Sequence, residues 1–161
     1  MLYSFDGRKP SVGIGTYVSE TALVIGDVRI GDHCYIGHGA ILRGDYGVIE
    51  IGNGTAVEEG VIIHAPPQDC CSIGNGVTIG HGAIIHAKLI GDRVGIGMGA
   101  IVKQGQKIPE SILVAGNPAK KIRDVSQREK DFRDRATKIY RDLAHKYCEL
   151  GMEKIERRIS A

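Results

Sequence analysis

The chain has 161 residues, the size of one domain with a core of its own. Its formal charge of +2 is near balance, and it contains neither a run of 18 apolar residues nor the apolar segment of a signal peptide. The sequence therefore predicts a cytoplasmic protein that binds neither nucleic acid nor membrane. Only 5% of the residues are aromatic and 23 are glycine, so we expect a core of small and branched aliphatic side chains on a repetitive backbone.

The first 124 residues are dominated by a repeat of six. Every sixth residue from Val12 to Leu42 is aliphatic, and after short interruptions the series continues to Val114. Glycine often follows the aliphatic residue. This is the hexapeptide repeat of a parallel β-helix, in which each hexad forms a short strand and a corner, and three hexads close a triangular coil. The sequence thus predicts an all-β fold, a single-stranded parallel β-helix over residues 1–124.

The pattern changes after the segment GNPAK at 116–120. Ser126 followed by Glu129 is a capping box, and apolar residues then recur at spacings of three and four as far as Leu150. Residues 125–161 are therefore predicted to contain an amphipathic α-helix that ends near Gly151. We expect it to pack on the flank or end of the β-helix, within one structural domain.

Three histidines fall at defined places on the predicted coils. His64 and His86 each follow the aliphatic residue of a hexad, three hexads apart once the loop after His64 is set aside. They should lie one above the other, with backbones about 4.8 Å apart. His81 sits one position later in its hexad, on a neighbouring face. Neutral imidazoles are common zinc ligands, but this arrangement does not easily surround one ion within one chain, and a neighbouring copy could supply the missing ligand.

The remaining histidines and the cysteines are expected to have ordinary roles. The cysteines have no disulfide-framework spacing, and we interpret them as reduced thiols. These cysteines are Cys34, Cys70, Cys71 and Cys148. The remaining histidines, interpreted as surface polar residues, are His33, His38 and His145.

Several motifs together resemble the γ-class carbonic anhydrases and their many relatives. They are RGD at 43–45, a histidine at 64, IGH with a second histidine at 86, GMGA at 97–100, and GNPAK before the C-terminal helix. The resemblance implies left-handed coils and a homotrimer with a metal at each interface. His64 and His86 would come from one chain and His81 from the next. It also implies Zn²⁺, with Fe²⁺ or Co²⁺ possible on the same ligands, and hydration of CO₂ to bicarbonate by a zinc-bound hydroxide.

The same resemblance suggests roles for four further residues. Arg43 and Asp45 would pair across the interface. Tyr140 matches a tyrosine that approaches the metal pocket, although its place on the apolar stripe also fits core packing. Glu58 stands where active members have a glutamine near the metal-bound water. Its carboxylate could accept a proton from that water, hold a second cation, or be an ordinary salt-bridge partner. The segment after His64 is shorter than the acidic shuttle loop of the type enzyme.

Three classes of function remain open from the sequence. The first is a carbonic anhydrase-like lyase that acts on CO₂ and bicarbonate. The second is an acyl-group enzyme, either a hexapeptide acyltransferase, which also carries a GNPAK-like end, or a thioesterase-like hydrolase. The third is a metal-binding or assembly module without turnover. Metal analysis would separate the second class from the others, and a CO₂ hydration assay would separate the first from the third.

Overall fold

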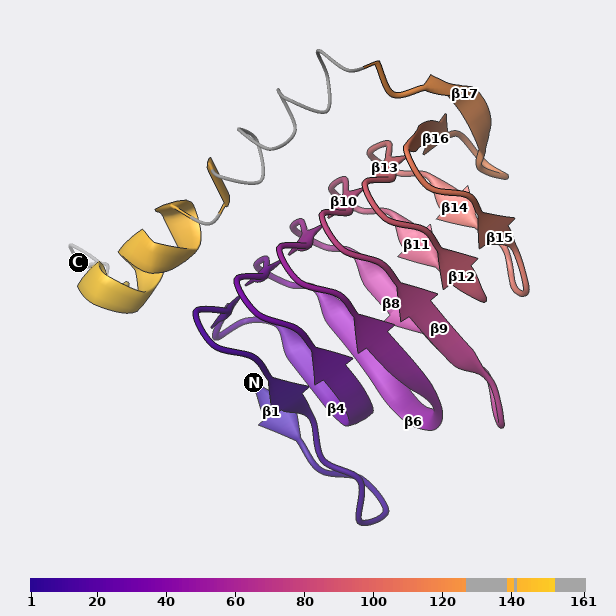
Figure 1. Ribbon diagram of the computed structural model, residues 1–161. Helices are drawn as coiled ribbons and strands as arrows, with labels where there is room; N and C mark the ends of the chain where they lie inside the picture. Colours follow the sequence, from indigo (N-terminus) through magenta and orange to yellow (C-terminus); the bar gives the residue numbers. More distant parts are fainter. Residues whose placement is uncertain (127–138, 141, 153–161) are drawn as a thin grey trace, which may run out of the picture.

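The computed structural model describes residues 1–126, 139–140 and 142–152. Its body is a solenoid of short parallel strands wound in successive coils, with a helical segment beside it (Figure 1). The predicted all-β fold, a parallel β-helix followed by a C-terminal helix, is confirmed.

The strands form three faces, because β4 and β6 each bend from one face to the next. The first face consists of β1 (Leu2–Tyr3), the first parts of β4 (Leu23–Ile30) and β6 (Ile41–Ile51), β8 (Ile62–His64), β11 (Ile84–Ile85) and β14 (Ile101–Val102). The second consists of β2 (Ser11–Val12), the later parts of β4 and β6, β9 (Cys70–Ile73), β12 (Leu89–Ile90) and β15 (Lys107–Ile108). The third consists of β3 (Tyr17–Val18), β5 (Tyr35–Ile36), β7 (Ala56–Val57), β10 (Thr78–Ile79), β13 (Gly95–Ile96), β16 (Ile112–Ala115) and the antiparallel β17 (Lys120–Asp124).

The core is the column of aliphatic residues that the period of six identifies. On the first face, Leu42, Ile63, Ile85 and Val102 stack in register, and all four are fully buried. Full burial of one such side chain stabilises the fold by about 1.5–3 kcal/mol. Since side chains alternate along a strand, the residue on either side of each core position points outward. The hexad therefore determines which side chains are available at the surface.

Two glycines allow β4 and β6 to bend together. Gly26 has a φ of +77° and pairs with Gly44 on the next coil. A Cβ at Gly26 would overlap the Gly44 carbonyl group, so the coils could not approach with a larger residue there. The bend leaves Arg43 at the end of the first face and Asp45 at the corner that follows it.

Residues 139–140 and 142–150 are helical and lie beside the N-terminal coils of the third face (Figure 1). Ala144 is buried against tyrosines of the solenoid, and the ring of Tyr147 stacks on Tyr17 with centroids 4.8 Å apart. The ring of Tyr140 contacts Tyr35 at a tilt of 40°, with centroids 5.1 Å apart. The apolar stripe of the described helix therefore packs on the flank of the β-helix.

Glu129 of the predicted capping box lies outside the described residues. Within the described part of the chain, no helix has the length and apolar character needed to cross a membrane.

Candidate functional site

The two stacked histidines meet at the end of the first face. Ile63 pairs with Ile85 in register, which places His64 of β8 next to His86, the residue after β11. The ring centroids are 4.7 Å apart, and His64 Nδ1 lies 2.6 Å from His86 Nε2. At this distance one nitrogen donates a proton and the other accepts it. The stacking predicted from the repeat is confirmed.

The second nitrogen of His64 faces a carboxylate. His64 Nε2 is buried without a hydrogen-bond partner, and Asp45 Oδ1 lies 3.7 Å from it. Burial lowers the pKa of His64 below its usual range, Arg43 and His86 lower it further, and Asp45 opposes them. His64 is therefore neutral near pH 7 and keeps a lone pair, as both a metal ligand and a general base require.

Arg43 and Asp45 form an ion pair within one chain. Arg43 Nη1 donates to Asp45 Oδ2 at 2.7 Å. Burial acts to raise the pKa of Asp45, but the hydrogen bond and charge of Arg43 outweigh it and leave that pKa below its usual range. Arg43 therefore keeps Asp45 ionised beside His64. Pairing of these residues across an interface between copies stays a prediction.

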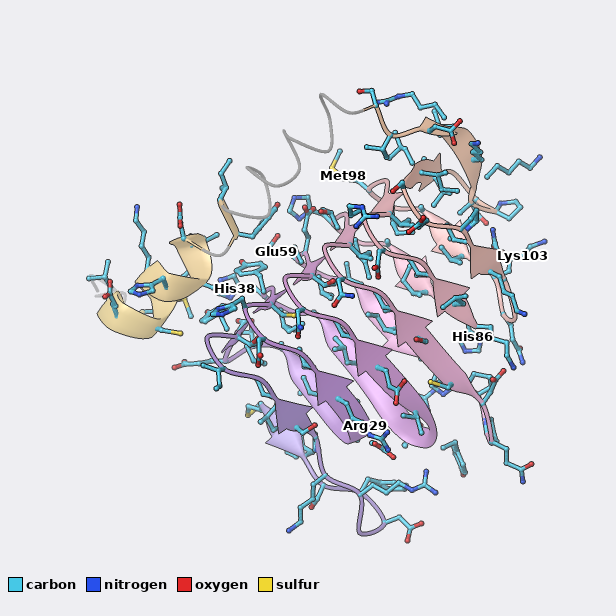
Figure 2. All side chains as sticks on the ribbon, viewed as in Figure 1. Arg29, His38, Glu59, His86, Met98 and Lys103 are labelled. Carbon is cyan, nitrogen blue, oxygen red and sulfur yellow. The ribbon has the colours of Figure 1, made fainter. Side chains whose placement is uncertain are left out.

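His81 lies at a different corner, between the third and first faces, where two carboxylates surround it. His81 Nδ1 is 2.7 Å from Glu59 Oε2, and His81 Nε2 is 3.2 Å from Glu58 Oε2. Glu58 is only 7% exposed and also accepts the backbone N–H of His81 at 3.1 Å. Figure 2 shows Glu59 near the helix and His86 at another edge of the solenoid.

Each of these carboxylates is hydrogen-bonded to a tyrosine. Tyr35 donates its hydroxyl to Glu59 Oε1 at 2.6 Å, and Tyr140 of the helix forms a hydrogen bond with Glu58. Burial raises the pKa of both tyrosines, and the hydrogen bonds to the carboxylates raise it further. Burial also acts to raise the pKa of Glu59, but the hydrogen bond from Tyr35 and the nearby His81 reverse this and lower it.

The structure thus divides the predicted site residues into two groups. His64, His86, Arg43 and Asp45 lie together on one edge, whereas His81, Glu58 and Tyr140 form a second cluster. Among the residues that the structure describes, no group of three or more His, Cys, Asp and Glu side chains could hold a metal ion within one chain.

Sequence reasoning did not identify Glu59 and Tyr35 as parts of the second cluster. The available signal was the pair of consecutive acids one coil before His81. Glu59 lies directly below the IGH segment, as the hydrogen bond from Gly82 N to the Glu59 carbonyl shows.

A stripe of aliphatic side chains lies on the outer surface of the first face, one position before each core residue. Its members pair in register from coil to coil and are Leu23, Ile41, Ile62, Ile84 and Ile101. Ile62 and Ile84 are 38% and 40% exposed. A continuous apolar surface of this kind is typical of a protein interface. It lies beside the histidine pair, because His64 and His86 follow Ile62 and Ile84 by two residues.

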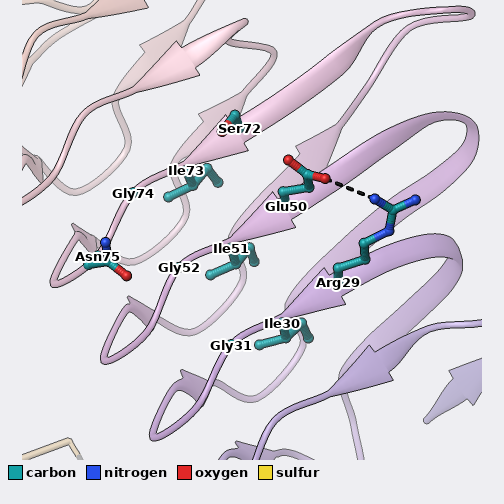
Figure 3. A pocket seen from close by; sticks show the side chains of 10 residues that line it. All are labelled: Arg29, Ile30, Gly31, Glu50, Ile51, Gly52, Ser72, Ile73, Gly74 and Asn75. Atoms are coloured by element: carbon teal, nitrogen blue, oxygen red, sulfur yellow. Dashed lines mark hydrogen bonds and ion pairs between the residues drawn. The ribbon is translucent and has the colours of Figure 1, made fainter.

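A separate, open depression of about 390 Å³ lies on the second face (Figure 3). Arg29 and Glu50 form an ion pair across it at 2.9 Å, and Ser72 and Asn75 line the coils beyond. The described residues that line it include no histidine. It therefore does not belong to either histidine cluster.

Comparison with known proteins identifies relatives that match nearly the whole chain. The carnitine operon protein CaiE of Escherichia coli (strain K12) is 33% identical over 172 residues, which cover 96% of this chain and 87% of that protein. CaiE of Proteus sp. (strain LE138) is 32% identical over 169 residues, covering 94% and 85%. No family model matches the chain.

Two solved structures are similar over most of their length. A hexapeptide transferase family protein from Anaplasma phagocytophilum has a TM-score of 0.75 and 27% identity, covering 91% of this chain and 98% of its own. A putative acetyltransferase from Bacillus cereus has a TM-score of 0.77 and 26% identity, covering 93% and 98%. These names favour the acyl-group alternative over the carbonic anhydrase interpretation.

Proposed function

Because the chain belongs to the hexapeptide-repeat family that includes the carnitine operon protein CaiE, we propose that it is an acyl-group enzyme. It would transfer the acyl group of a thioester such as an acyl-CoA to an amine or hydroxyl, or hydrolyse that thioester with water. The names of the two similar structures, a hexapeptide transferase family protein and a putative acetyltransferase, support this class of reaction.

The observation that carries the proposal is the row Asp45–His64–His86. Asp45 faces His64 Nε2, and His64 Nδ1 contacts His86 Nε2 at 2.6 Å. If the proton in this contact is on His86, the Nδ1 atom of His86 has a free lone pair. It makes no hydrogen bond with the residues that the structure describes. A base that is hydrogen-bonded to a second group, with a carboxylate at ion-pair distance beyond it, resembles the arrangement used to activate nucleophiles.

The proposed chemistry needs one proton acceptor at this place. His86 Nδ1 would remove a proton from the amine, hydroxyl or water that receives the acyl group. The nitrogen or oxygen of that molecule then attacks the carbonyl carbon of the thioester. The C–S bond then breaks, and the sulfur takes the proton from His86 and leaves as a thiol. His64 and Asp45 stabilise the positive charge that His86 carries between these two transfers.

We also propose that the active assembly is a homotrimer. The outer stripe that includes Ile62 and Ile84 is partly exposed in a single chain, and a second copy would cover it. Because the histidine pair lies beside this stripe, it would then lie close to the interface. His81 of the next chain could then approach the pair, which matters only for the metal-dependent candidate below, because acyl transfer by His86 does not require it.

Metal-dependent hydration of CO₂ is the second candidate function. A specific feature favours it, namely two imidazole nitrogens that face each other while His64 is held neutral. His64 and His86 fit two zinc ligands, and His81 of a neighbouring copy would be the third. When bound there, Zn²⁺, Fe²⁺ or Co²⁺ would supply a Lewis acid that makes water nucleophilic at neutral pH. In this case Glu58 and Tyr140 would lie beside the third ligand.

Two assays on the same preparation separate the candidates. One follows thiol release from acetyl-CoA, with and without amine acceptors, and the other follows CO₂ hydration by stopped flow. The acyl-group proposal expects thiol release that His86→Ala abolishes, that His145→Ala leaves unchanged, and that survives removal of metal by a chelator. Hydration of CO₂ that the chelator abolishes would instead support the second candidate. If neither reaction occurs, both enzymatic proposals are refuted.

A further inference from the structure

The corner that holds His81 contains a set of hydrogen bonds for which the acyl-group chemistry has no use. Glu59 uses both carboxylate oxygens, with Oε2 lying 2.7 Å from His81 Nδ1 and Oε1 accepting the Tyr35 hydroxyl at 2.6 Å. Tyr35 is 1% exposed and packs between the rings of Tyr17 and Tyr140. His81, by contrast, keeps 48% of its side chain exposed. A buried, rigid pair thus holds one side of an accessible imidazole.

We propose that Glu59 and Tyr35 are positioning residues that fix which nitrogen His81 presents to a neighbouring copy. Glu59 accepts the Nδ1 proton of His81, and Tyr35 holds the carboxylate in place, so that the lone pair is on His81 Nε2. The inference rests on the interface site of the second, metal-dependent candidate function, in which His81 of one chain approaches the histidine pair of the next.

The physical reason is that a neutral imidazole carries one proton, and the partner of that N–H determines the tautomer and the ring orientation. A carboxylate that accepts the N–H is the strongest common partner, because the hydrogen bond is charge-assisted. Histidines that bind metals are usually held in this way by their other nitrogen. The carboxylate at 2.7 Å from Nδ1 is therefore placed to leave the lone pair on Nε2, the nitrogen that faces Glu58 Oε2 at 3.2 Å within a single chain.

Glu58 is the competing partner within a single chain. Its Oε2 lies 3.2 Å from His81 Nε2, which is longer than the contact of Glu59, and the same oxygen already accepts the backbone N–H of His81. We therefore assign the ring proton to the Glu59 side. If Glu58 determined the tautomer, the proton would be on Nε2 and the lone pair would be on Nδ1, facing Glu59. The two assignments predict opposite results for the same variants.

The test uses the full chain labelled with ¹⁵N-histidine, treated with a chelator and kept at a pH where the imidazoles are neutral. The ¹⁵N shifts of His81 distinguish a protonated nitrogen from one with a lone pair, and the resonances are assigned with His81→Ala. We expect Nδ1 to be protonated in the wild type. Glu59→Ala should shift His81 to a mixture of both tautomers, and Tyr35→Phe should shift it partly. Glu59→Gln should preserve the wild-type tautomer, because its amide oxygen can still accept the proton.

Matched controls make the assignment falsifiable. Tyr46→Phe changes an exposed tyrosine and should leave the His81 shifts unchanged, and a circular dichroism spectrum verifies that each variant is folded. Protonation of Nε2 in the wild type, or an unchanged tautomer in folded Glu59→Ala, overturns the proposal. Loss of the wild-type tautomer in Glu58→Ala, with Glu59→Ala unaffected, overturns it in favour of Glu58.

A zinc titration gives a second readout. If His81 is a ligand, Glu59→Ala should weaken Zn²⁺ binding by about tenfold to a hundredfold, whereas Glu59→Gln and Tyr46→Phe should bind like the wild type. A wild-type protein that binds no Zn²⁺ refutes the metal candidate, and the tautomer alone then decides the present proposal. Likewise, absence of thiol release counts against the acyl-group function only. It leaves the present proposal unaffected, because the tautomer is measured without any substrate.

Discussion

If His81 of one chain meets the histidine pair of another, two variants that each lack one part of this shared site should complement each other when mixed. Within a chain, His81 and His86 are five positions apart around a corner of the coil, a path of at most about 16 Å at roughly 3.3 Å per residue. Nitrogens that bind one zinc ion each lie about 2 Å from it. The described residues of a single chain accordingly contain no group of three such side chains that could hold an ion.

The mixing experiment uses His64→Ala and His81→Ala chains, unfolded together in equal amounts and refolded. A site is complete only where a His81→Ala chain supplies the pair and its neighbour, a His64→Ala chain, supplies His81. In a cyclic trimer assembled at random this occurs for roughly ½ × ½, or a quarter, of the sites. Bound Zn²⁺ per chain, and CO₂ hydration where the wild type has it, should recover to about a quarter of the wild-type level.

The matched control mixes His64→Ala with His86→Ala. Both residues belong to the pair that one chain supplies, so no arrangement of these two variants restores a complete site, and we expect no recovery. The shared site would be refuted if the first mixture also gave no recovery while native mass spectrometry detected mixed trimers. Equal recovery in the two mixtures would refute it as well.

Three further predictions concern stability, assembly and thiol exposure. Ile85→Ala should lower the free energy of unfolding by about 2–5 kcal/mol in urea denaturation, because Ile85 is fully buried, whereas Ile84→Ala should chiefly weaken assembly in analytical ultracentrifugation. Ellman's reagent at pH 8 should modify the exposed Cys148 first and Cys71 only on unfolding, since burial raises the pKa of Cys71 to about 12. Stability should also fall as the pH drops below the ordinary histidine pKa of about 6.5, because the lowered pKa of His64 lets the unfolded chain bind the proton first. In urea melts from pH 8 to 5, a fall of equal size in His64→Gln would contradict this.

The repeat predicted those parts of the structure that depend only on backbone periodicity. The period of six separates inward from outward residues, and it correctly stacks His64 on His86 across a loop of irregular length. Stacking of identical positions is dictated by the parallel register between coils. For this reason the fold and the histidine pair could both be derived before the structure was known.

Contacts that depend on side-chain direction could not be derived in this way. Glu59 reaches His81 from the coil below, and Tyr35 reaches Glu59 from a different strand, so no spacing in the sequence connects the three. The pairing of Arg43 with Asp45 inside one chain depends on the bend at Gly44, which the hexad count does not predict. Periodicity determines on which face a residue lies, but not which of several polar neighbours it contacts.

The choice between acyl-group chemistry and CO₂ hydration depends on assembly for the same reason. A neutral imidazole can accept a proton or bind a metal, and the His64–His86 pair suits either role within one chain. The two candidate functions differ in whether the histidine pair needs a third group beside it. A metal site needs a third ligand beside the pair, and only a second copy can bring His81 there, because the chain's own His81 belongs to another corner. Acyl transfer by His86 needs no such ligand and would continue in His81→Ala. Activity that persists in this variant thus favours the acyl-group enzyme, whereas activity lost in His81→Ala and recovered to a quarter by mixing favours a metal shared between chains.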